Sequence, residues 1–528
     1  MARKYGKKRP VASAAAAAIF GAADSTITAP IPPSPSRPAL AEITNLLERT
    51  TLKIDCVDST DKVKKTSNKD DAADITNLLE RTAINDDAAK SITVLEETIV
   101  NDDTLDKIVV SIDKISISPS PVDEATSPEP IPTLKPALAA SLAPLLDAYQ
   151  IDRGYPLATK KWDEVLAPGS TLEKIAEASY AEVFRITNAI GSSILKLLRL
   201  KVPTDPTSKK SDTAIKVDTV VSEMRLMNAL TEIPGFVKFK DAHIVEGKPP
   251  AAFVEAYEAH IESAEESYFP HPNDISEAAV FLAIELGDAG CVLEQCKVNN
   301  IHQMWDIFLG VVIALARAEI EYEFEHRDLH ENNICILQHP QSKPYSSAPS
   351  SPNHKYGNSN VEVTILDYGL SRASLPSGTT VFYDLEQDIC VFRGESDSPI
   401  AAIQFSNYRR MRTWLYSRSK SPDTKYASGK LKKSERNGHS WEEYTPYTNA
   451  LWIHFLLEYL TRSYKGRDKR AWNRDVKELR EWLDPDEGGM ESAGDVLQYA
   501  YEREWIGQED LDEVSSSMLR DEEEDEDI

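Results

Sequence analysis

The pattern of hydrophobic and polar positions changes near residue 150. Residues 1–150 are rich in Ala, Ser, Thr, Pro and Asp, with little sustained helical or strand periodicity. Such a segment buries too little apolar surface to offset the entropy of ordering the chain, so the sequence predicts that it is mostly disordered. From about 155, aromatic residues become frequent and β-branched runs alternate with helical patterns. The folded part is therefore expected to begin there.

Strand-like patterns come first in the folded part, and helical patterns follow. The strand-like runs cover residues 172–187, 193–200, 236–244, 251–257 and 279–286. One helical pattern interrupts them around 217–230, and the long patterns after residue 300 are helical, at 302–324 and 449–464. A strand-rich half followed by a helix-rich half predicts an α+β fold with two lobes.

We place the boundary between these lobes near residue 287. The N-lobe, 155–287, is expected to hold an antiparallel sheet with one helix, and the C-lobe, 288–505, to be mostly helical. The last segment, 506–528, ends in seven consecutive acidic residues, Asp521 to Asp527. A charge run of this kind predicts a solvated tail.

The N-terminal 150 residues contain a repeat and a basic cluster. The octapeptide ITNLLERT occurs at 43–50 and again at 75–82. Two copies are too few for a solenoid, so they indicate a duplicated segment or a pair of docking motifs. The basic residues at the start of the chain are Arg3, Lys4, Lys7, Lys8 and Arg9. They suggest a nuclear-localisation or docking patch, because the Ala-rich run behind them lacks the Leu-rich core of a signal peptide.

Composition narrows the partners and the compartment. The formal net charge of −27 argues against broad affinity for nucleic acid and favours basic partners such as a cationic protein tail. The five cysteines are Cys56, Cys291, Cys296, Cys335 and Cys390. They lack the paired spacing of zinc ligands, so we expect reduced thiols in a cytosolic or nuclear protein and no disulfide. No run approaches the ~18 uninterrupted apolar residues of a membrane span.

The stretch EHRDLHENNICIL at 325–337 carries the strongest chemical signal. A polar turn before a buried strand is the ordinary explanation of such a stretch. The alternative is the catalytic loop of a protein kinase, H-R-D-L-x-x-x-N. Asp328 would accept the proton of the substrate hydroxyl, and Asn333, five residues later, would turn back toward a metal ion.

A second motif follows in the order that phosphoryl transfer requires. The stretch VTILDYGLSR at 363–372 is an apolar strand that ends in Asp367, Tyr368 and Gly369. Asp367 matches the Mg²⁺-binding position of D-F-G, with Tyr in place of Phe. The interval between the two motifs is long, and a Ser-, Pro- and Asn-rich insertion at 339–360 accounts for it. Together the motifs favour the kinase interpretation over a polar turn.

The expected nucleotide loop departs from the usual pattern. In KIAEASYAEVFRI at 174–186, the G-x-G-x-x-G-x-V pattern is matched by Ala176, Ala178, Tyr180, Ala181 and Val183, with alanine in place of every glycine. Such a loop is stiffer, and its backbone approaches phosphate less freely. By itself this match is weak.

Two lysines could bind the α- and β-phosphates of ATP. Lys216 lies in a stretch that resembles V-A-I-K, but it precedes Glu223 by too few residues to leave room for a strand end, a connection and a helix turn. Lys196 follows Val183 at a distance that suits two strands joined by a hairpin. We therefore predict a Lys196–Glu223 ion pair and expect Lys216 to lie on the surface.

The stretch AVFLAIELGDAG at 279–290 is expected to enter the hinge between the lobes. Ile284 would be the gatekeeper, and the backbone of Glu285, Leu286 and Gly287 would hold adenine. A buried strand and turn would have the same sequence pattern, so this assignment depends on the other motifs.

At this point the chain resembles the haspin family of protein kinases, over roughly residues 155–505. The resemblance rests on H-R-D-L-H with His330, on D-Y-G-L-S-R, and on VFYDLEQDICVFRGE at 381–395 and PYTNALWIHFLLEYL at 446–460. No A-P-E follows D-Y-G, which is a feature of this family. The alanine-bearing loop departs from the family's pattern, as does Gly369 in place of Thr.

The resemblance implies an ATP- and Mg²⁺-dependent serine/threonine kinase that phosphorylates a threonine near the N-terminus of histone H3 in mitosis. This supports recruitment of the chromosomal passenger complex and chromosome segregation. The resemblance implies a monomer that is nuclear and chromosome-associated, and it allows a cytoplasmic pool as well. It also implies that the kinase needs no activation-loop phosphorylation. Our candidates for gripping the basic tail are His330, Asp384, Glu386 and Asp388.

Further expectations concern the partners of the protein and two alternatives to an active protein kinase. The basic N-terminus could act as a pseudosubstrate or dock a cohesin-associated partner, and neither direct sequence-specific nucleic-acid binding nor a membrane contact is expected. A pseudokinase scaffold is suggested by the missing glycines. A small-molecule kinase is the third alternative, and Arg327, Tyr180 and the segment 381–395 argue against it.

Overall fold

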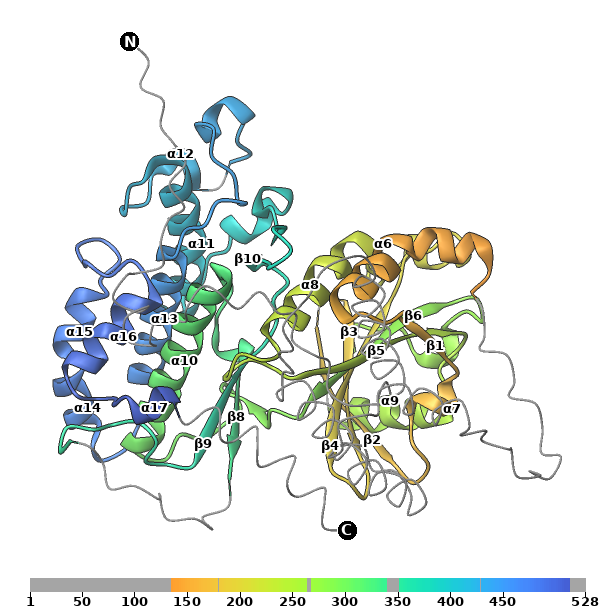
Figure 1. The fold of residues 1–528 in the computed structure, drawn as a ribbon, viewed down its shortest axis with the longest axis horizontal. Helices are drawn as coiled ribbons and strands as arrows, with labels where there is room; N and C mark the ends of the chain where they lie inside the picture. Colours follow the sequence, from red (N-terminus) through yellow and green to blue (C-terminus); the bar gives the residue numbers. More distant parts are fainter. Residues whose placement is uncertain (1–133, 179, 264–266, 340–350, 428, 513–528) are drawn as a thin grey trace, which may run out of the picture. The chain divides into compact units, whose positions relative to one another are not determined.

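The computed structural model describes residues 134–178, 180–263, 267–339, 351–427 and 429–512 (Figure 1). The predicted disordered residues 1–133, including both copies of ITNLLERT and the basic cluster, lie outside this part of the chain, as do the acids from Asp521 to Asp527. Strands dominate its first half and helices its second, so the predicted α+β fold is confirmed.

The N-lobe is built on a six-stranded sheet in the order β1-β5-β6-β4-β3-β2. The strands are β1 (Ala158–Lys160), β2 (Thr171–Glu177), β3 (Ala181–Thr187), β4 (Ser192–Arg199), β5 (Phe239–Glu246) and β6 (Val280–Gly287). Strands β2 to β6 pair antiparallel, as predicted. Strand β1 was not expected, and it pairs with β5 in parallel.

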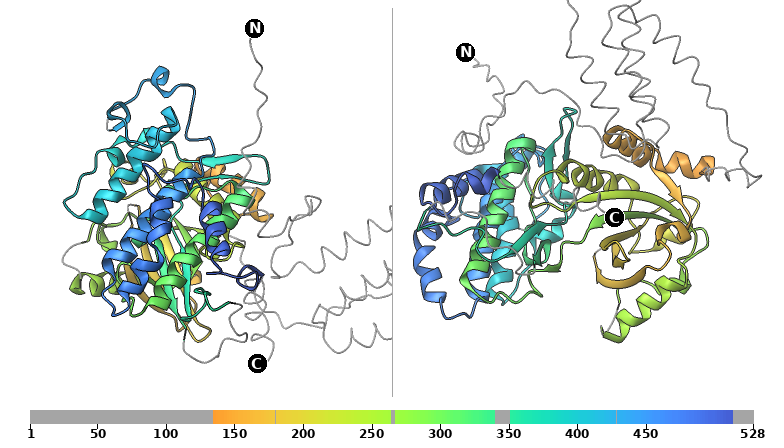
Figure 2. Two further views of the ribbon diagram at one scale, coloured as in Figure 1. Left: turned by 90° about the vertical axis from the view of Figure 1, so that its left-hand side faces the viewer. Right: turned by 60° about the horizontal axis from the view of Figure 1, so that its bottom comes forward.

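Alternating side chains of the sheet enter two different cores. In β6, Leu282 and Ile284 join the large core that includes the helices α6 (Pro136–Arg153) and α8 (Val217–Leu230). Phe281 and Ala283 join a smaller core with the helix α9 (Ala251–Ser263). Because successive strand residues point to opposite faces, α6 and α8 cover one face of the sheet and α9 the other (Figures 1 and 2).

The predicted strand at 251–257 is wrong, because this segment forms the start of α9. Short apolar runs do not distinguish a strand from a buried helix. As a helix, the segment brings Phe253, Ala256 and Tyr257 to one face, where Phe253 stacks edge-on with Phe184 of β3. The expectation of one N-lobe helix is also wrong, since α6, a short α7 (Trp162–Val165) and α9 accompany α8.

Helix α6 shows that the ordered chain begins before residue 150. Its residues Leu138, Leu142, Leu145 and Tyr149 are buried at the spacing of one helix face. The helix lies beside α8, and the Asp152 carboxylate pairs with Arg225 of that helix at 2.9 Å (Figure 1). The predicted boundary of the disordered segment at 150 is therefore wrong, because the Ala- and Pro-rich composition masked an amphipathic pattern.

The C-lobe is organised around two buried helices that the sequence predicts, α10 (Ile301–Tyr322) and α13 (Tyr447–Ser463). Its further helices are α11 (Pro399–Ser417), α12 (Thr424–Ala427), α14 (Lys469–Asp475), α15 (Lys477–Trp482), α16 (Ala493–Glu502) and α17 (Glu509–Asp512). Helix α10 has the length and apolar composition of a membrane span, but 72% of its apolar window is buried inside the fold. It is the central helix of this lobe's core.

Small strands complete the C-lobe, and its C-terminal boundary differs from the prediction. The strands are β7 (Cys291–Val292), β8 (Ile334–Gln338), β9 (Val361–Ile365), β10 (Arg372–Ser374) and β11 (Thr380–Phe382). Ile506 and Leu511 are buried, and His354 Nε2 lies 2.7 Å from Asp510 Oδ2. The folded part therefore continues beyond residue 505, to at least 512.

The cysteines also differ in part from the prediction. Cys291 and Cys296 form a disulfide, so the expectation that all thiols are reduced is wrong for this pair. The reason is local, because a turn after β7 bonds the Cys296 N–H to Val292 O at 3.2 Å and folds the second cysteine back toward the first. Cys335 and Cys390 are free thiols, the first buried and the second exposed.

The contribution of α6 can be tested with two substitutions on this one helix. Leu142 is fully buried, whereas Ile151 is 70% exposed. We expect Leu142→Ala to lower the free energy of unfolding by about 2–5 kcal/mol, because it leaves a cavity against α8. Ile151→Ala should change it by less than about 0.5 kcal/mol. Equal urea midpoints for the two variants would contradict the packing role of α6.

Candidate active site

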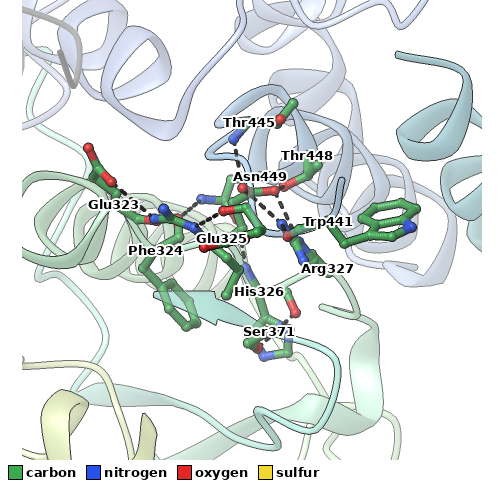
Figure 3. Close-up of polar contacts among 12 residues, drawn as sticks. Glu323, Phe324, Glu325, His326, Arg327, Ser371, Trp441, Thr445, Thr448 and Asn449 are labelled. Carbon is green, nitrogen blue, oxygen red and sulfur yellow. Dashed lines mark hydrogen bonds and ion pairs between the residues drawn. The ribbon is translucent and has the colours of Figure 1, made fainter. Parts of the chain in front are cut away.

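The loop before β8 is held by a buried ion pair between Arg327 of the predicted H-R-D motif and Glu325, the residue before that motif (Figure 3). Arg327 donates from Nε and Nη2 to the two carboxylate oxygens of Glu325, each at 3.1 Å, and from Nη2 to Trp441 O at 2.8 Å. Glu325 also accepts from the Thr445 N–H at 2.6 Å and from the Thr448 hydroxyl at 2.9 Å. The positive charge of Arg327 is therefore neutralised by Glu325, which lies two residues earlier in the same loop.

His326 occupies the centre of this network as a neutral imidazole. Its Nδ1 accepts from the Asp328 N–H at 3.3 Å, so Nε2 carries the proton that is donated to Leu366 O at 2.8 Å. Its backbone N–H donates to the Asn449 side chain at 3.0 Å (Figure 3). Burial lowers the pKa of His326 to about 4. The histidine thus ties the loop to the segment that carries Asp367.

Asp328 is half-buried and stands where the predicted base must stand. The pKa of its carboxyl is raised to about 8, because burial and the charge of Asp367 outweigh the lowering effect of the hydrogen bond from Tyr408. The Tyr408 hydroxyl on α11 donates to Asp328 Oδ1. Sequence reasoning missed Tyr408, because it lies 80 residues away in a helix without a recognisable motif.

The two predicted metal ligands, Asn333 and Asp367, both interact with Asp328, the first by a hydrogen bond and the second through its charge. Asn333 donates its side-chain Nδ2 to Asp328 O at 2.8 Å, which leaves the amide oxygen as a ligand atom. Asp367 follows β9 with a left-handed φ of 60°, and its Oδ1 accepts the Gly369 N–H at 3.1 Å. Desolvation raises the pKa of Asp367, but the charge of Lys196 and the Gly369 bond outweigh it and lower the pKa overall. An amide oxygen and an ionised carboxylate are the oxygen ligands that Mg²⁺ prefers.

The aromatic residue after Asp367 explains why tyrosine suits this position. The Tyr368 hydroxyl donates to Ile365 O at 2.9 Å and accepts the Val237 N–H at 3.3 Å. Val237 belongs to the connection before β5 in the N-lobe, so one buried hydroxyl joins the two lobes beneath the site. The Val237 N–H also donates to Ile365 O at 3.2 Å, so a phenylalanine would remove only one of its two acceptors.

The predicted Lys196–Glu223 pair is present. Lys196 of β4 donates to Glu223 Oε1 of α8, and it lies directly across the sheet from Val183 of β3. Burial alone would lower the pKa of Lys196, but Glu223 and Asp367 raise it overall, so the ammonium stays charged. Lys216, the alternative, is exposed at the N-terminus of α8, as predicted.

The alanine-bearing loop is a tight hairpin between β2 and β3. The Ala178 N–H donates to Ala181 O at 2.8 Å, Ala181 is buried, and the sheet register shifts between Lys174 and Ala176. Tyr180 at its tip is 43% exposed. The two predicted positions Ala176 and Val183 pair with each other across the hairpin.

An unpredicted clamp from α9 and the chain after it holds this hairpin. The buried Lys174 ammonium pairs with Glu177 at 2.7 Å and Glu182 at 2.6 Å, and it lies 4.6 Å from the ring centroid of Tyr257. Glu177 accepts in turn from the Tyr268 N–H at 2.9 Å. This network provides stiffness that glycines would not, and it shapes a pocket of about 440 Å³ beside the hairpin.

The hinge candidates lie at the end of β6. Ile284 is buried directly opposite Lys196, which suits a gatekeeper, and Glu285 and Leu286 follow it in the strand. The Gly287 N–H donates to Lys238 O at 2.8 Å, so adenine could use this N–H only by displacing that bond. Its neighbour Asp288, which the sequence analysis missed, accepts from Arg185 at 2.9 Å and Ser192 at 2.7 Å and fixes the hinge to the sheet.

The four substrate-binding candidates lie in three different surroundings. His330 Nε2 lies 3.9 Å from Asp328 Oδ1, whereas Asp384 and Asp388 are half-exposed and exposed at the starts of two short 3₁₀ turns. Glu386 is buried, and Arg412 of α11 donates to both its oxygens at 2.7 Å. The prediction that Glu386 grips substrate is therefore wrong, because its carboxylate is consumed by an internal ion pair.

Comparisons with known proteins agree with this geometry. The family described as "Haspin like kinase domain" matches residues 147–493. The "Serine/threonine-protein kinase haspin homolog" of Drosophila melanogaster is 26% identical over 325 residues, which cover 58% of this chain and 52% of the relative. The "Serine/threonine-protein kinase haspin" of Mus musculus is 27% identical over 318 residues, 59% of this chain and 38% of the relative.

A plant relative extends the same pattern. The "Serine/threonine-protein kinase haspin homolog" of Arabidopsis thaliana is 25% identical over 339 residues, 62% of this chain and 50% of the relative. The chain therefore spans about half the length, or less, of these curated relatives.

The two lysine candidates provide a matched test of the phosphate-binding position. We expect Lys196→Ala to reduce phosphate transfer about 100-fold or more, because the phosphates lose a preorganised charge that Glu223 holds in place. Lys216→Ala should leave the rate within about twofold, since its side chain is exposed. The check is the initial rate at saturating ATP for both variants, and comparable rates would refute the assignment.

Neutral His326 predicts a pH dependence of stability. Its pKa of about 4 in the folded protein lies below the 6.5 of an unperturbed histidine, so between these values the unfolded chain binds more protons. Protonation of His326 therefore does not reduce the free energy of unfolding above pH 6.5, but reduces it increasingly as the pH falls toward 4. We expect the melting temperature of His326→Gln to fall less between pH 7 and pH 5 than that of the unmodified protein. The comparison is His339→Gln, which replaces a histidine whose side chain is 49% exposed. Equal falls for His326→Gln and the unmodified protein would contradict the assignment.

Proposed function

The chain belongs to the haspin-like kinase family, and from this premise we propose that it is a protein kinase that transfers the γ-phosphate of ATP to a serine or threonine hydroxyl. One observation carries the proposal: Asp328, Asn333 and Asp367 meet beside the charged Lys196, so the base, the metal ligands and the phosphate-binding cation share one site.

Each group has a defined task in this reaction. Asp328 would accept the proton of the acceptor hydroxyl, and Lys196, oriented by Glu223, would hold the α- and β-phosphates. Asn333 and Asp367 fit Mg²⁺, which when bound would neutralise charge on the phosphates. Because the described residues include every charged group of this set, they favour a working kinase over a pseudokinase scaffold.

The loop network supports activity without a phosphorylated activation segment. In this chain the Arg327 guanidinium already has a carboxylate partner, Glu325, so it does not need an incoming phosphate to be neutralised. The segment after D-Y-G is fixed in the same way, by the buried Glu386–Arg412 pair. These two ion pairs favour one arrangement of the site before any modification.

We propose further that the acceptor is a threonine near the N-terminus of histone H3, phosphorylated in mitosis by a nuclear, chromosome-associated enzyme that supports recruitment of the chromosomal passenger complex. The family motifs at 381–395 support this substrate, and so does the charge of −27, which suits a basic tail. The exposed carboxylate of Asp388 is the main proposed contact with that tail. The carboxylate of Asp384 is half-exposed and lies 3.7 Å from Arg436 Nη1, so a basic tail would share it with that arginine.

The test is phosphate transfer from labelled ATP with Mg²⁺ by the full chain. It compares an N-terminal histone H3 peptide with the same peptide carrying Ala at its first threonine. We expect label in the threonine peptide alone and a loss of about 100-fold or more in Asp328→Asn, because the general base is removed. ATP binding without label in any peptide would overturn the kinase proposal in favour of a scaffold. Equal labelling of both peptides would overturn the assigned acceptor only.

A further inference from the structure

A buried tyrosine of α11 is hydrogen-bonded to the catalytic carboxylate. Tyr408 is 5% exposed, and its hydroxyl donates to Asp328 Oδ1. Gln404, one turn earlier on the helix, donates Nε2 to the same hydroxyl at 3.4 Å, and the Tyr408 ring packs edge-on against Trp452 of α13 with centroids 5.5 Å apart. The ring and the hydroxyl are thus held from two helices.

The direction of the bond follows from the chemistry of both partners. Burial and the charge of Asp328 raise the pKa of Tyr408, so the hydroxyl keeps its proton and acts as the donor. A carboxylate has two oxygens, and a donor on Oδ1 leaves Oδ2 to accept from another group. The acceptor hydroxyl of a substrate needs one such oxygen in a defined orientation.

The backbone of Asp328 is fixed by other contacts, but its carboxylate is not. His326 and Asn333 bond the backbone N–H and the carbonyl of Asp328, respectively. Within the part of the chain that the structure describes, Tyr408 is the one side chain that hydrogen-bonds the carboxylate, since His330 Nε2 lies 3.9 Å away. The orientation of the reacting oxygen therefore depends on α11.

Helix α11 is itself anchored to the segment after D-Y-G. Arg409 donates Nη1 to Phe392 O at 3.3 Å and to Gly394 O at 2.9 Å. Arg412 forms the buried pair with Glu386 one turn later. Three positions within five residues of one helix thus connect Asp328 to the segment after D-Y-G.

We propose that Tyr408 is a positioning residue, which holds Asp328 Oδ1 and so presents Oδ2 to the acceptor hydroxyl. The proposal rests on the proposed kinase function. It assigns no contact between Tyr408 and substrate or nucleotide, so the residue should influence the rate of the chemical step and not the binding of either reactant.

The first test compares two Tyr→Phe variants in the full chain. Tyr408→Phe should lower kcat by about 10-fold or more, because the hydrogen bond that orients the Asp328 carboxyl is lost, with KM for ATP and for peptide unchanged. Tyr447→Phe is the matched control: Tyr447 is 3% exposed and donates to Pro485 O at 2.8 Å, so this variant also loses one buried hydrogen bond. Equal kcat values for the two variants would overturn the proposal.

A double variant keeps the proposal testable if Tyr408→Phe also lowers stability. Should Tyr408 act through Asp328, adding Tyr408→Phe to Asp328→Asn will slow transfer no further than Asp328→Asn alone. If the fold-reductions in transfer rate of the two single variants multiply in the double variant, Tyr408 acts independently of Asp328, and its proposed role is overturned. Absence of turnover in the unmodified chain would instead overturn the proposed function, and the assigned role of Tyr408 with it.

Discussion

The site depends on the buried pair between Glu325 and Arg327. Placing two charges in a protein interior is costly unless each is paired and hydrogen-bonded. Here Glu325 is 0% exposed and accepts from Arg327, Thr445 and Thr448, so its desolvation is offset by four hydrogen bonds. Removing either charge would leave the other buried without a partner of opposite charge.

This pair also determines the course of the catalytic loop. Arg327 has a left-handed φ of 66°, a conformation that costs a non-glycine residue about 1 kcal/mol or more. The bonds of its guanidinium to Glu325 and Trp441 hold that turn, and the turn directs Asp328 toward Asp367 and Tyr408. The left-handed backbone of Arg327 is thus maintained by the side-chain bonds of Arg327 to Glu325 and to Trp441, which precedes α13.

The same principle recurs around the nucleotide loop and between the lobes. Where glycines are missing, the Lys174 cluster and α9 hold the hairpin from outside. Where lobe contact is needed, the Tyr368 hydroxyl bonds both Ile365 and the N-lobe residue Val237. Hydrogen bonds and ion pairs between buried polar groups therefore hold the segments of this site in place.

Local patterns in the sequence were sufficient for the motifs and the main helices. Asp328, Asn333 and Asp367 could be assigned because their chemistry depends on spacing along one chain segment, and Lys196 because a hairpin fixes its distance from Val183. Helices α8, α10 and α13 could be predicted because the helical pattern of apolar residues extends over many residues in each. The segment at 251–257 could not be assigned, since its short apolar run fits either a strand or a helix.

Tertiary structure decided which charges face solvent and which face one another. The sequence does not distinguish the three acidic residues Asp384, Glu386 and Asp388 from one another. Only Glu386 is buried, because it pairs with Arg412, which lies 26 residues later on α11. Tyr408 reaches Asp328 across 80 residues, and no periodicity encodes that contact. The sequence by itself determined the identity of the candidate reacting groups, because their motifs are local, whereas their orientation depends on long-range packing that only the folded chain specifies.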